Sequence, residues 1–99
     1  MMTGDPITAE KAARIGMIYK AYSDEEFEEK SWDLAIKLSK MPTKGLALTK
    51  KLLNASNTNN LQEQLEMEKR SQKIAAETED YKEGVSAFLE KRKPKFKGK

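Results

Sequence analysis

Apolar residues recur at helical spacing in several short segments of this chain, and most of these segments begin at a capping residue. Ser23 is followed three residues later by Glu26, the spacing of a capping box at a helix N-terminus. The apolar positions that follow lie on one helical face: Phe27, Leu34, Ala35 and Leu38. The pattern predicts a helix that extends from this box to about Lys40.

A short helix and a connector are predicted before Ser23. The Thr8 hydroxyl can accept a hydrogen bond from a free amide of the first helical turn, and Gly16 ends the helix. The next residues, MIYKAY (17–22), are too few for a stable helix and are rich in β-branched and aromatic types. They predict an extended connector or an edge strand.

Three more helices are predicted after Lys40. Pro42 suits the first position of a helix, and the polar run NASNTNN (54–60) ends that helix. The next helix extends over residues 61–76, and Thr78 caps the last one, which we expect to end at Pro94. The expected fold class is mostly α, with five amphipathic helices and one short extended connector. Five such helices bring more apolar surface than a bundle of 99 residues hides, so some of it is expected to meet another surface.

The residue types for several kinds of chemistry are missing. The chain has no cysteine and no histidine, no glycine-rich phosphate loop and no serine in a strand-turn-helix elbow. The acidic run DEEFEE (24–29) fits a solvated first helical turn. Glu68 lies on a half-apolar stripe, where we expect a buried hydrogen bond across a helix interface rather than catalysis. We predict no catalytic residue and no metal site.

Positive charge is concentrated at the end of the chain. Residues 91–99 contain six lysine or arginine side chains and no acid, which leaves 13 basic and 16 acidic residues in the first 90. This asymmetry favours one anionic contact over a broad nucleic-acid surface. No stretch approaches the roughly 20 apolar residues of a membrane span, and the N-terminus lacks the layout of a signal peptide. We expect a cytoplasmic protein that binds neither membrane nor nucleic acid.

Four strings together resemble the C-terminal part of the crotonase (enoyl-CoA hydratase/isomerase) superfamily. TGDPITAEKAARIGMIYKAY (3–22) is similar to the loop and helix after that family's core spiral, and EDYKEGVSAFLEKRKPKF (79–96) to its terminal helix and tail. KMPTKGLALTKKLLN (40–54) and NLQEQLEMEKRSQ (60–72) are similar to the helices that the family uses for trimer assembly. The branch that these strings resemble comprises the short-chain enoyl-CoA hydratases and the phenylacetate-pathway isomerases.

The resemblance implies a C-terminal fragment of an enzyme that hydrates or isomerises acyl-CoA thioesters in fatty-acid or aromatic-acid degradation. It divides the chain into an end of the core-linked part (1–22), a helical oligomerisation segment (23–93) and a basic tail (94–99). The family's oxyanion amides and catalytic carboxylates lie upstream of the matched strings, so we expect this chain alone to be inactive. The implied partners are acyl-CoA and further copies, as a trimer or a dimer of trimers. Coenzyme A enters as part of the substrate, without a separate cofactor.

The resemblance also assigns a coenzyme A contact to Phe88 and Lys91, near the adenine and the 3′-phosphate. An aromatic ring stacks on a purine, an ammonium pairs with a phosphate, and a spacing of three places both on one side of a helix. Core packing is the alternative for Phe88, and a solvated, frayed end is the alternative for the terminal lysines.

Two other functions stay open at this point. One is a free-standing helical adaptor whose basic tail binds an acidic partner or nucleic acid, although only Phe96 in that tail could stack on a base. The other is a small acyl-CoA-binding bundle, which fits the length and the α class.

Overall fold

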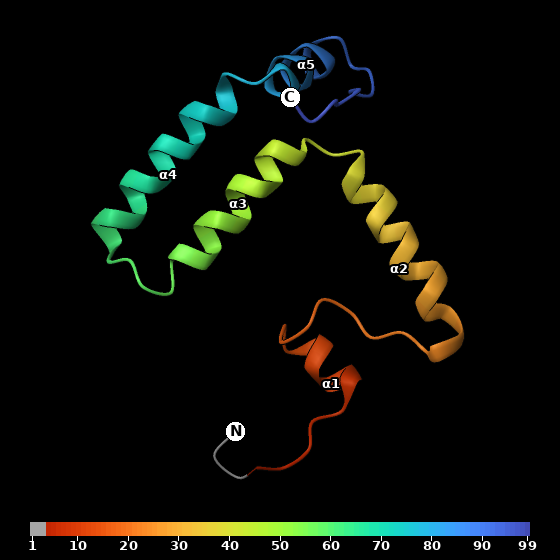
Figure 1. The fold of residues 1–99 in the computed structure, drawn as a ribbon. Coiled ribbons are helices and arrows are strands. Elements are labelled where there is room, and N and C mark those ends of the chain that lie inside the picture. The colour runs from red at the N-terminus through yellow and green to blue at the C-terminus, as the bar shows by residue number, and fades with distance from the viewer. Residues whose placement is uncertain (1–3) are drawn as a thin grey trace. The chain divides into compact units, whose positions relative to one another are not determined.

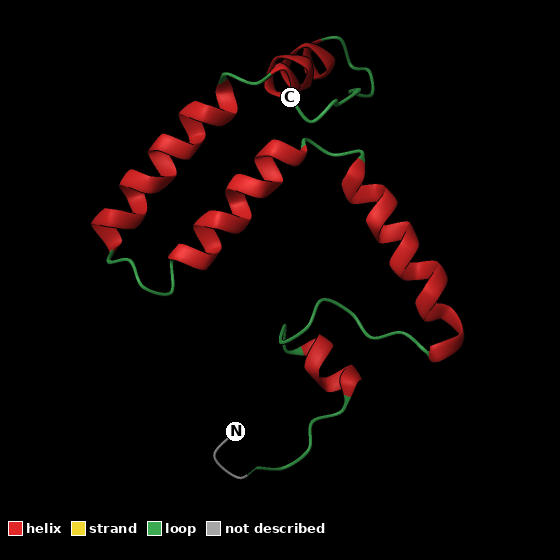
Figure 2. Cartoon of the chain, in the orientation of Figure 1, coloured by secondary structure: helices red, strands yellow, loops and turns green. Residues whose placement is uncertain are grey.

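The computed structural model describes residues 4–99 and contains five helices and no strand in that range (Figures 1 and 2). The helices are α1 (Ala9–Arg14), α2 (Asp24–Ser39), α3 (Thr43–Ala55), α4 (Leu61–Ala76) and α5 (Glu79–Leu89). The mostly α fold class is therefore confirmed. The chain forms two compact units that divide within α2, one up to Leu34 and the other from Ala35 to Lys99.

The first unit contains α1 and most of α2. The Thr8 hydroxyl caps α1 by accepting a hydrogen bond from the Lys11 amide at 3.3 Å, as the sequence predicts. Gly16 follows the helix with a φ of 76°, in the left-handed region that glycine adopts without strain. The amides of Met17 and Ile18 then turn back to the Ala12 carbonyl oxygen. The connector over residues 17–22 thus bends around the end of α1 and forms no strand.

The start of α2 keeps half of the predicted capping box. The Ser23 hydroxyl accepts a hydrogen bond from the Glu26 amide at 3.4 Å and also contacts the Glu26 carboxylate at 3.4 Å. In a full box the carboxylate would instead accept from the Ser23 amide. The helix still begins at the residue after Ser23 and ends one residue before Lys40.

In the second unit α3 and α4 lie side by side, joined by a polar loop (Figure 1). Asn60 begins α4 with a complete capping box: its side chain accepts from the Glu63 amide at 3.0 Å, and the Glu63 carboxylate accepts from the Asn60 amide at 2.9 Å. The Gln64 amide group reaches across to the Leu52 carbonyl oxygen of α3 at 3.4 Å. This polar link fixes the two helices at the loop end of the pair.

Two expectations for these helices are wrong. Pro42 is the N-cap of α3 rather than its first helical residue, since its ψ of 85° lies outside the helical region. Glu68 is exposed and accepts a hydrogen bond from Gln64, one turn earlier in the same helix, at 3.1 Å. A carboxylate that water already solvates needs no partner across an interface. The predicted buried hydrogen bond of Glu68 is therefore not formed.

The last helix begins as predicted and ends earlier. The Thr78 hydroxyl caps α5 by accepting from the Tyr81 amide at 3.1 Å. The helix ends at Leu89, and Lys91 has a positive φ of 54°, the left-handed conformation that often follows a helix C-cap. The helix therefore ends well before Pro94, because the chain has already turned out of the helical path.

Very little of the apolar surface is buried in residues 4–99. Only two apolar side chains there are buried, and both are small: Ala12 and Ala87. Large apolar side chains of every helix longer than α1 stay exposed, which agrees with the expectation of surplus apolar surface. None of the helices in this range is long and apolar enough to cross a membrane.

Candidate functional site

An apolar groove of about 410 Å³ lies where the start of α3, the end of α4, helix α5 and the tail meet. We call it the α5 groove. Its walls include Pro42, Tyr81, Gly84, Val85, Phe88 and Phe96. Five of these six side chains are apolar or glycine, so the groove suits a flat or aliphatic group more than an ion.

Phe88, one of the two predicted contact residues, lines this groove and is 82% exposed. The alternative of core packing for Phe88 is wrong within the described chain, because no neighbouring helix covers the ring. An exposed phenylalanine beside a groove is available to a ligand or to another protein surface.

Lys91, the other predicted contact residue, lies beyond α5. It follows the C-cap Glu90, and its amide donates to the Phe88 carbonyl oxygen at 3.2 Å. The expectation that Phe88 and Lys91 share one side of a helix is therefore wrong, since the helix has ended before Lys91. The two residues are instead linked through a left-handed turn, and the Lys91 side chain is exposed.

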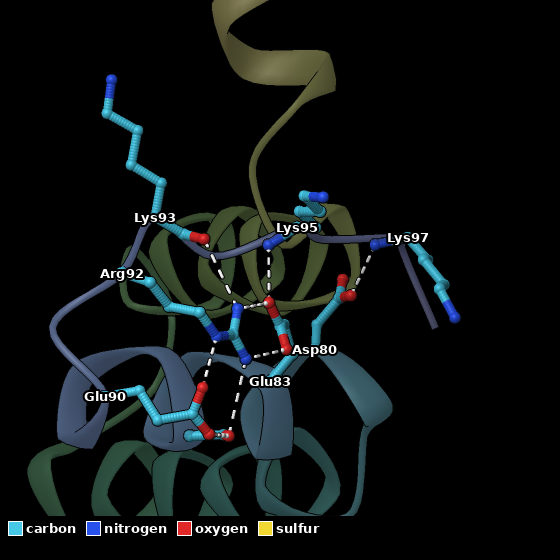
Figure 3. Close-up of polar contacts among 8 residues, drawn as sticks. Asp80, Glu83, Glu90, Arg92, Lys93, Lys95 and Lys97 are labelled. Atoms are coloured by element: carbon cyan, nitrogen blue, oxygen red, sulfur yellow. Dashed lines mark hydrogen bonds and ion pairs between the residues drawn. The ribbon is translucent and has the colours of Figure 1, made fainter.

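Arg92 holds the turn after α5 by contacts with two carboxylates (Figure 3). Its Nη1 and Nη2 lie 2.6 and 2.9 Å from the two oxygens of Glu83, and its Nε lies 2.7 Å from Glu90. The bond from Arg92 and a second one from the Lys95 amide lower the pKa of Glu83 from 4.5 to about 2, while the pKa of Arg92 is raised. The pKa of Glu90 is lowered as well, first by the Ser86 hydroxyl and then by Arg92.

The tail is bound to α5 through its main chain (Figure 3). The Lys95 amide donates to Glu83 at 2.8 Å, and the Lys97 and Gly98 amides donate to the two oxygens of Asp80 at 2.6 and 2.8 Å. The Asp80 amide lies in the first turn of α5, where it has no acceptor within the helix, and it donates to the Lys99 main-chain oxygen at 3.0 Å. These bonds contradict the alternative of a frayed end.

The lysine side chains at positions 93, 95 and 97 do not take part in this binding. Lys93, Lys95 and Lys97 are exposed, and among residues 4–99 none of them forms an ion pair with a carboxylate. Figure 3 shows the side chains of Lys93 and Lys97 extending away from the carboxylates of α5. The tail thus keeps these three ammonium groups available to an anion while its main chain is fixed.

The sequence alone does not predict Asp80, Glu83 and Arg92 as a cluster. It indicates only a favourable charge for Asp80 in the first helical turn, and no role for Glu83 or Arg92. One signal is present, because Asp80 and Glu83 are three residues apart and so lie on one helical face. In residues 4–99 no group of three or more acidic, histidine or cysteine side chains could hold a metal ion.

Comparison with known proteins shows the family of the chain. A family model described as enoyl-CoA hydratase/isomerase matches residues 1–99. The chain is 43% identical over 98 residues to 1,2-epoxyphenylacetyl-CoA isomerase of Escherichia coli (strain K12) and 41% identical over 95 residues to a probable enoyl-CoA hydratase of Rhodobacter capsulatus. These matches cover 99% and 96% of this chain and 37% of each relative.

The structure also matches solved structures. A crystal structure of an enoyl-CoA hydratase from Polaromonas sp. JS666 superposes with a TM-score of 0.88 at 28% identity, over 98% of this chain and 38% of that one. The five helices correspond to the helical C-terminal part of the crotonase fold, and the chain spans a little over a third of the length of these relatives. The chain belongs to the enoyl-CoA hydratase/isomerase family.

Proposed function

We propose that this chain supplies the helical segment of an enzyme that hydrates or isomerises acyl-CoA thioesters, and that it forms one edge of the coenzyme A site. The observation that carries the proposal is the exposure of Phe88 on α5, beside an apolar groove and close in sequence to a set of exposed ammonium groups. The names of the two relatives described above, a CoA isomerase and a probable enoyl-CoA hydratase, support this substrate class.

The chemistry of coenzyme A suits this edge. Its adenine is a flat aromatic ring that stacks on a phenylalanine face, and its 3′-phosphate is an anion that pairs with an ammonium group. Phe88 offers the ring and Lys91 the ammonium in this proposal. The exposed lysines of the tail add positive potential that attracts the phosphates.

The chemical step itself is assigned to residues outside this chain. Catalysis at the α and β carbons of an acyl thioester needs donors that stabilise the enolate-like oxygen and a carboxylate that moves a proton. The α5 groove contains one carboxylate, Asp80, and two main-chain amides already occupy it. We therefore expect the 99-residue chain to show no hydratase or isomerase turnover on its own.

The exposed apolar faces of α3 and α4 have a separate role in this proposal. Leu53, Leu61 and Leu65 are each at least half exposed, and such surface is stable in water only when another surface covers it. We assign these faces to contacts with the rest of the enzyme and with its other copies.

Calorimetric titration of the chain with coenzyme A, dephospho-coenzyme A and pantetheine tests the coenzyme A edge. We expect affinity to fall in that order, since the first step removes the 3′-phosphate and the second removes the adenine together with the ribose and the diphosphate. Phe88→Ala should weaken coenzyme A binding roughly 2- to 12-fold, the equivalent of one aromatic stack. Leu53→Ala is the matched control, because Leu53 is also exposed but lies on α3 outside the groove.

Equal affinity for the three ligands, or an unchanged affinity in Phe88→Ala, would contradict the proposed edge. A salt titration separates it from the adaptor function with a phosphate-binding tail. Binding to a phosphate backbone weakens steeply with salt and is indifferent to adenine, whereas the proposed edge prefers ligands that contain adenine.

A further inference from the structure

Two carboxylates of α5 hold the tail at three main-chain amides, and this arrangement is more specific than charge attraction. Asp80 accepts from the Lys97 amide, and Glu83 accepts from the Lys95 amide (Figure 3). Asp80 also accepts from the Gly98 amide. Glu83 also accepts two bonds from the Arg92 side chain, but within residues 4–99 neither carboxylate pairs with a lysine side chain of this segment. The contact therefore fixes the course of the main chain and leaves the lysine side chains free.

The surroundings of Asp80 fit a role in holding the main chain of the tail rather than a role in solubility. Asp80 is only 2% exposed, and a buried carboxylate is costly unless hydrogen-bond donors satisfy it. Both oxygens have a main-chain donor within 2.8 Å, and neither has an ion-pair partner in the described range. The main-chain amides of the tail thus satisfy both oxygens of the buried Asp80 carboxylate.

The tail passes close to two glycines. A Cβ on Gly84 of α5 would lie 3.6 Å from the ring of Phe96, an ordinary van der Waals distance, so the ring lies against the helix near this position. Gly98 has a φ of 75°, and a Cβ there would lie only 2.6 Å from the Thr43 hydroxyl at the start of α3. The tail therefore passes between α5 and the first residue of α3, and a larger residue at Gly98 would be strained by its φ and would have to displace the Thr43 side chain.

We infer that Asp80 and Glu83 are positioning residues that latch residues 92–99 as a strap and so place Phe96 in the wall of the α5 groove. Phe88 and Phe96 then line one groove from two different segments, and the second ring is in place only while the strap is latched. The inference rests on the proposed function for the identity of the ligand, coenzyme A. The latch itself is measured without any ligand.

Amide hydrogen exchange of the full chain, followed by NMR at neutral pH, measures the latch. Asp80→Asn should lower the protection of the Lys97 and Gly98 amides roughly tenfold or more, because one of two charged acceptors becomes an amide donor. Glu83→Gln should do the same at Lys95.

Glu66→Gln is the matched control for both variants. It also removes one carboxylate, but Glu66 pairs with Arg70 at 3.5 Å on the exposed surface of α4. Unchanged helical circular dichroism in all three variants shows that α5 is still folded. Unchanged protection of the tail amides in Asp80→Asn and Glu83→Gln would overturn the latch.

A second variant changes the strap itself instead of α5, so it tests the latch even if Asp80→Asn disturbs the start of α5. Gly98→Ala leaves every side chain of α5 intact, but it is strained by the positive φ and by the contact with Thr43. We expect it to lower the protection of the Lys97 and Gly98 amides as Asp80→Asn does. Wild-type protection in Gly98→Ala would overturn the close passage of the strap.

Coenzyme A titration of the same variants tests the positioning of Phe96. Asp80→Asn and Phe96→Ala should weaken coenzyme A binding by a similar factor, and the double variant should bind no more weakly than either single variant. Phe96→Tyr, which keeps an aromatic ring at this position, should bind with the affinity of the wild type. Loss of tail protection with unchanged affinity would overturn the positioning role while the proposed site at Phe88 stands. A wild-type chain with a protected tail and no affinity for coenzyme A would instead overturn the proposed function and leave the latch in place.

Discussion

The guanidinium of Arg92 lies along the carboxylate of Glu83, with Nη1 2.6 Å from Oε1 and Nη2 2.9 Å from Oε2. This two-bond geometry is specific to arginine, because its planar fork matches the two oxygens of a carboxylate. The pair joins the middle of α5 to the residue that follows the turn at Lys91. It therefore sets the direction in which the tail leaves the helix.

Replacement of Arg92 by lysine should loosen the tail although the charge is kept. A lysine ammonium is a point charge and fixes the Glu83 carboxylate less firmly than the arginine fork does. The Lys95 amide donates to this carboxylate, so we expect its hydrogen exchange to be faster. The melting temperature should change little, because the pair is partly exposed to water. Arg70→Lys is the control, since Arg70 pairs with Glu66 through one 3.5 Å contact on an exposed helix. Equal effects of the two substitutions on the Lys95 amide would contradict the role of the fork.

The pH dependence of stability should carry the signature of Glu83. Its pKa is about 2 in the folded chain against 4.5 for an ordinary glutamate, so the folded state favours the charged form. The contribution is fully present above pH 4.5 and is lost as the pH falls toward 2. Urea unfolding of the wild type and of Glu83→Gln across this range should show a difference that shrinks on acidification. A difference that stays constant from neutral pH to pH 2 would contradict this assignment.

The starts of the helices are predictable from the sequence because their signals are local. The hydroxyls of Thr8 and Thr78 each bond an amide three residues later, and that distance along the chain is fixed by helical geometry. The family strings likewise lie in continuous segments, so the amino-acid sequence by itself carries the resemblance. The capping box of Asn60 can be predicted from the sequence for the same reason, since Glu63 lies at the required spacing of three residues.

The path of the tail is beyond such reasoning. It depends on pairs that are distant along the chain: Glu83 with Arg92, nine residues apart, and Asp80 with Lys97, seventeen residues apart. Pro94 predicts a plausible but wrong end for the helix, because the left-handed turn at Lys91 has already taken the chain out of the helical path. The partner of a carboxylate is decided by tertiary structure, so the sequence pattern predicts burial for the exposed Glu68 and does not reveal the burial of Asp80.

Loss of the Asn60 side chain should destabilise the α3–α4 pair. In Asn60→Ala the Glu63 amide loses its acceptor, so we expect a decrease of about 1 kcal/mol in the free energy of unfolding. Urea unfolding followed by circular dichroism measures it. Asn57→Ala is the matched control, since the Asn57 side chain makes a single long contact of 3.5 Å with the Asn54 carbonyl oxygen. The capping role would be refuted if both variants lost the same stability.

Self-association of the 99-residue chain should follow from its exposed apolar faces. Buried apolar side chains in residues 4–99 are limited to two alanines, whereas Leu61 and Leu65 of α4 are 76% and 51% exposed. Water disfavours such surface at roughly 25 cal/mol per Å², so copies of the chain gain free energy by covering it for one another. We expect sedimentation velocity to show association that grows with concentration and persists at high salt, because apolar burial is not screened. Leu65→Lys should weaken it and Gln62→Lys, the same added charge at a polar position of α4, should not. A single monomeric species at every concentration, with a cooperative thermal transition, would show that these faces need no cover.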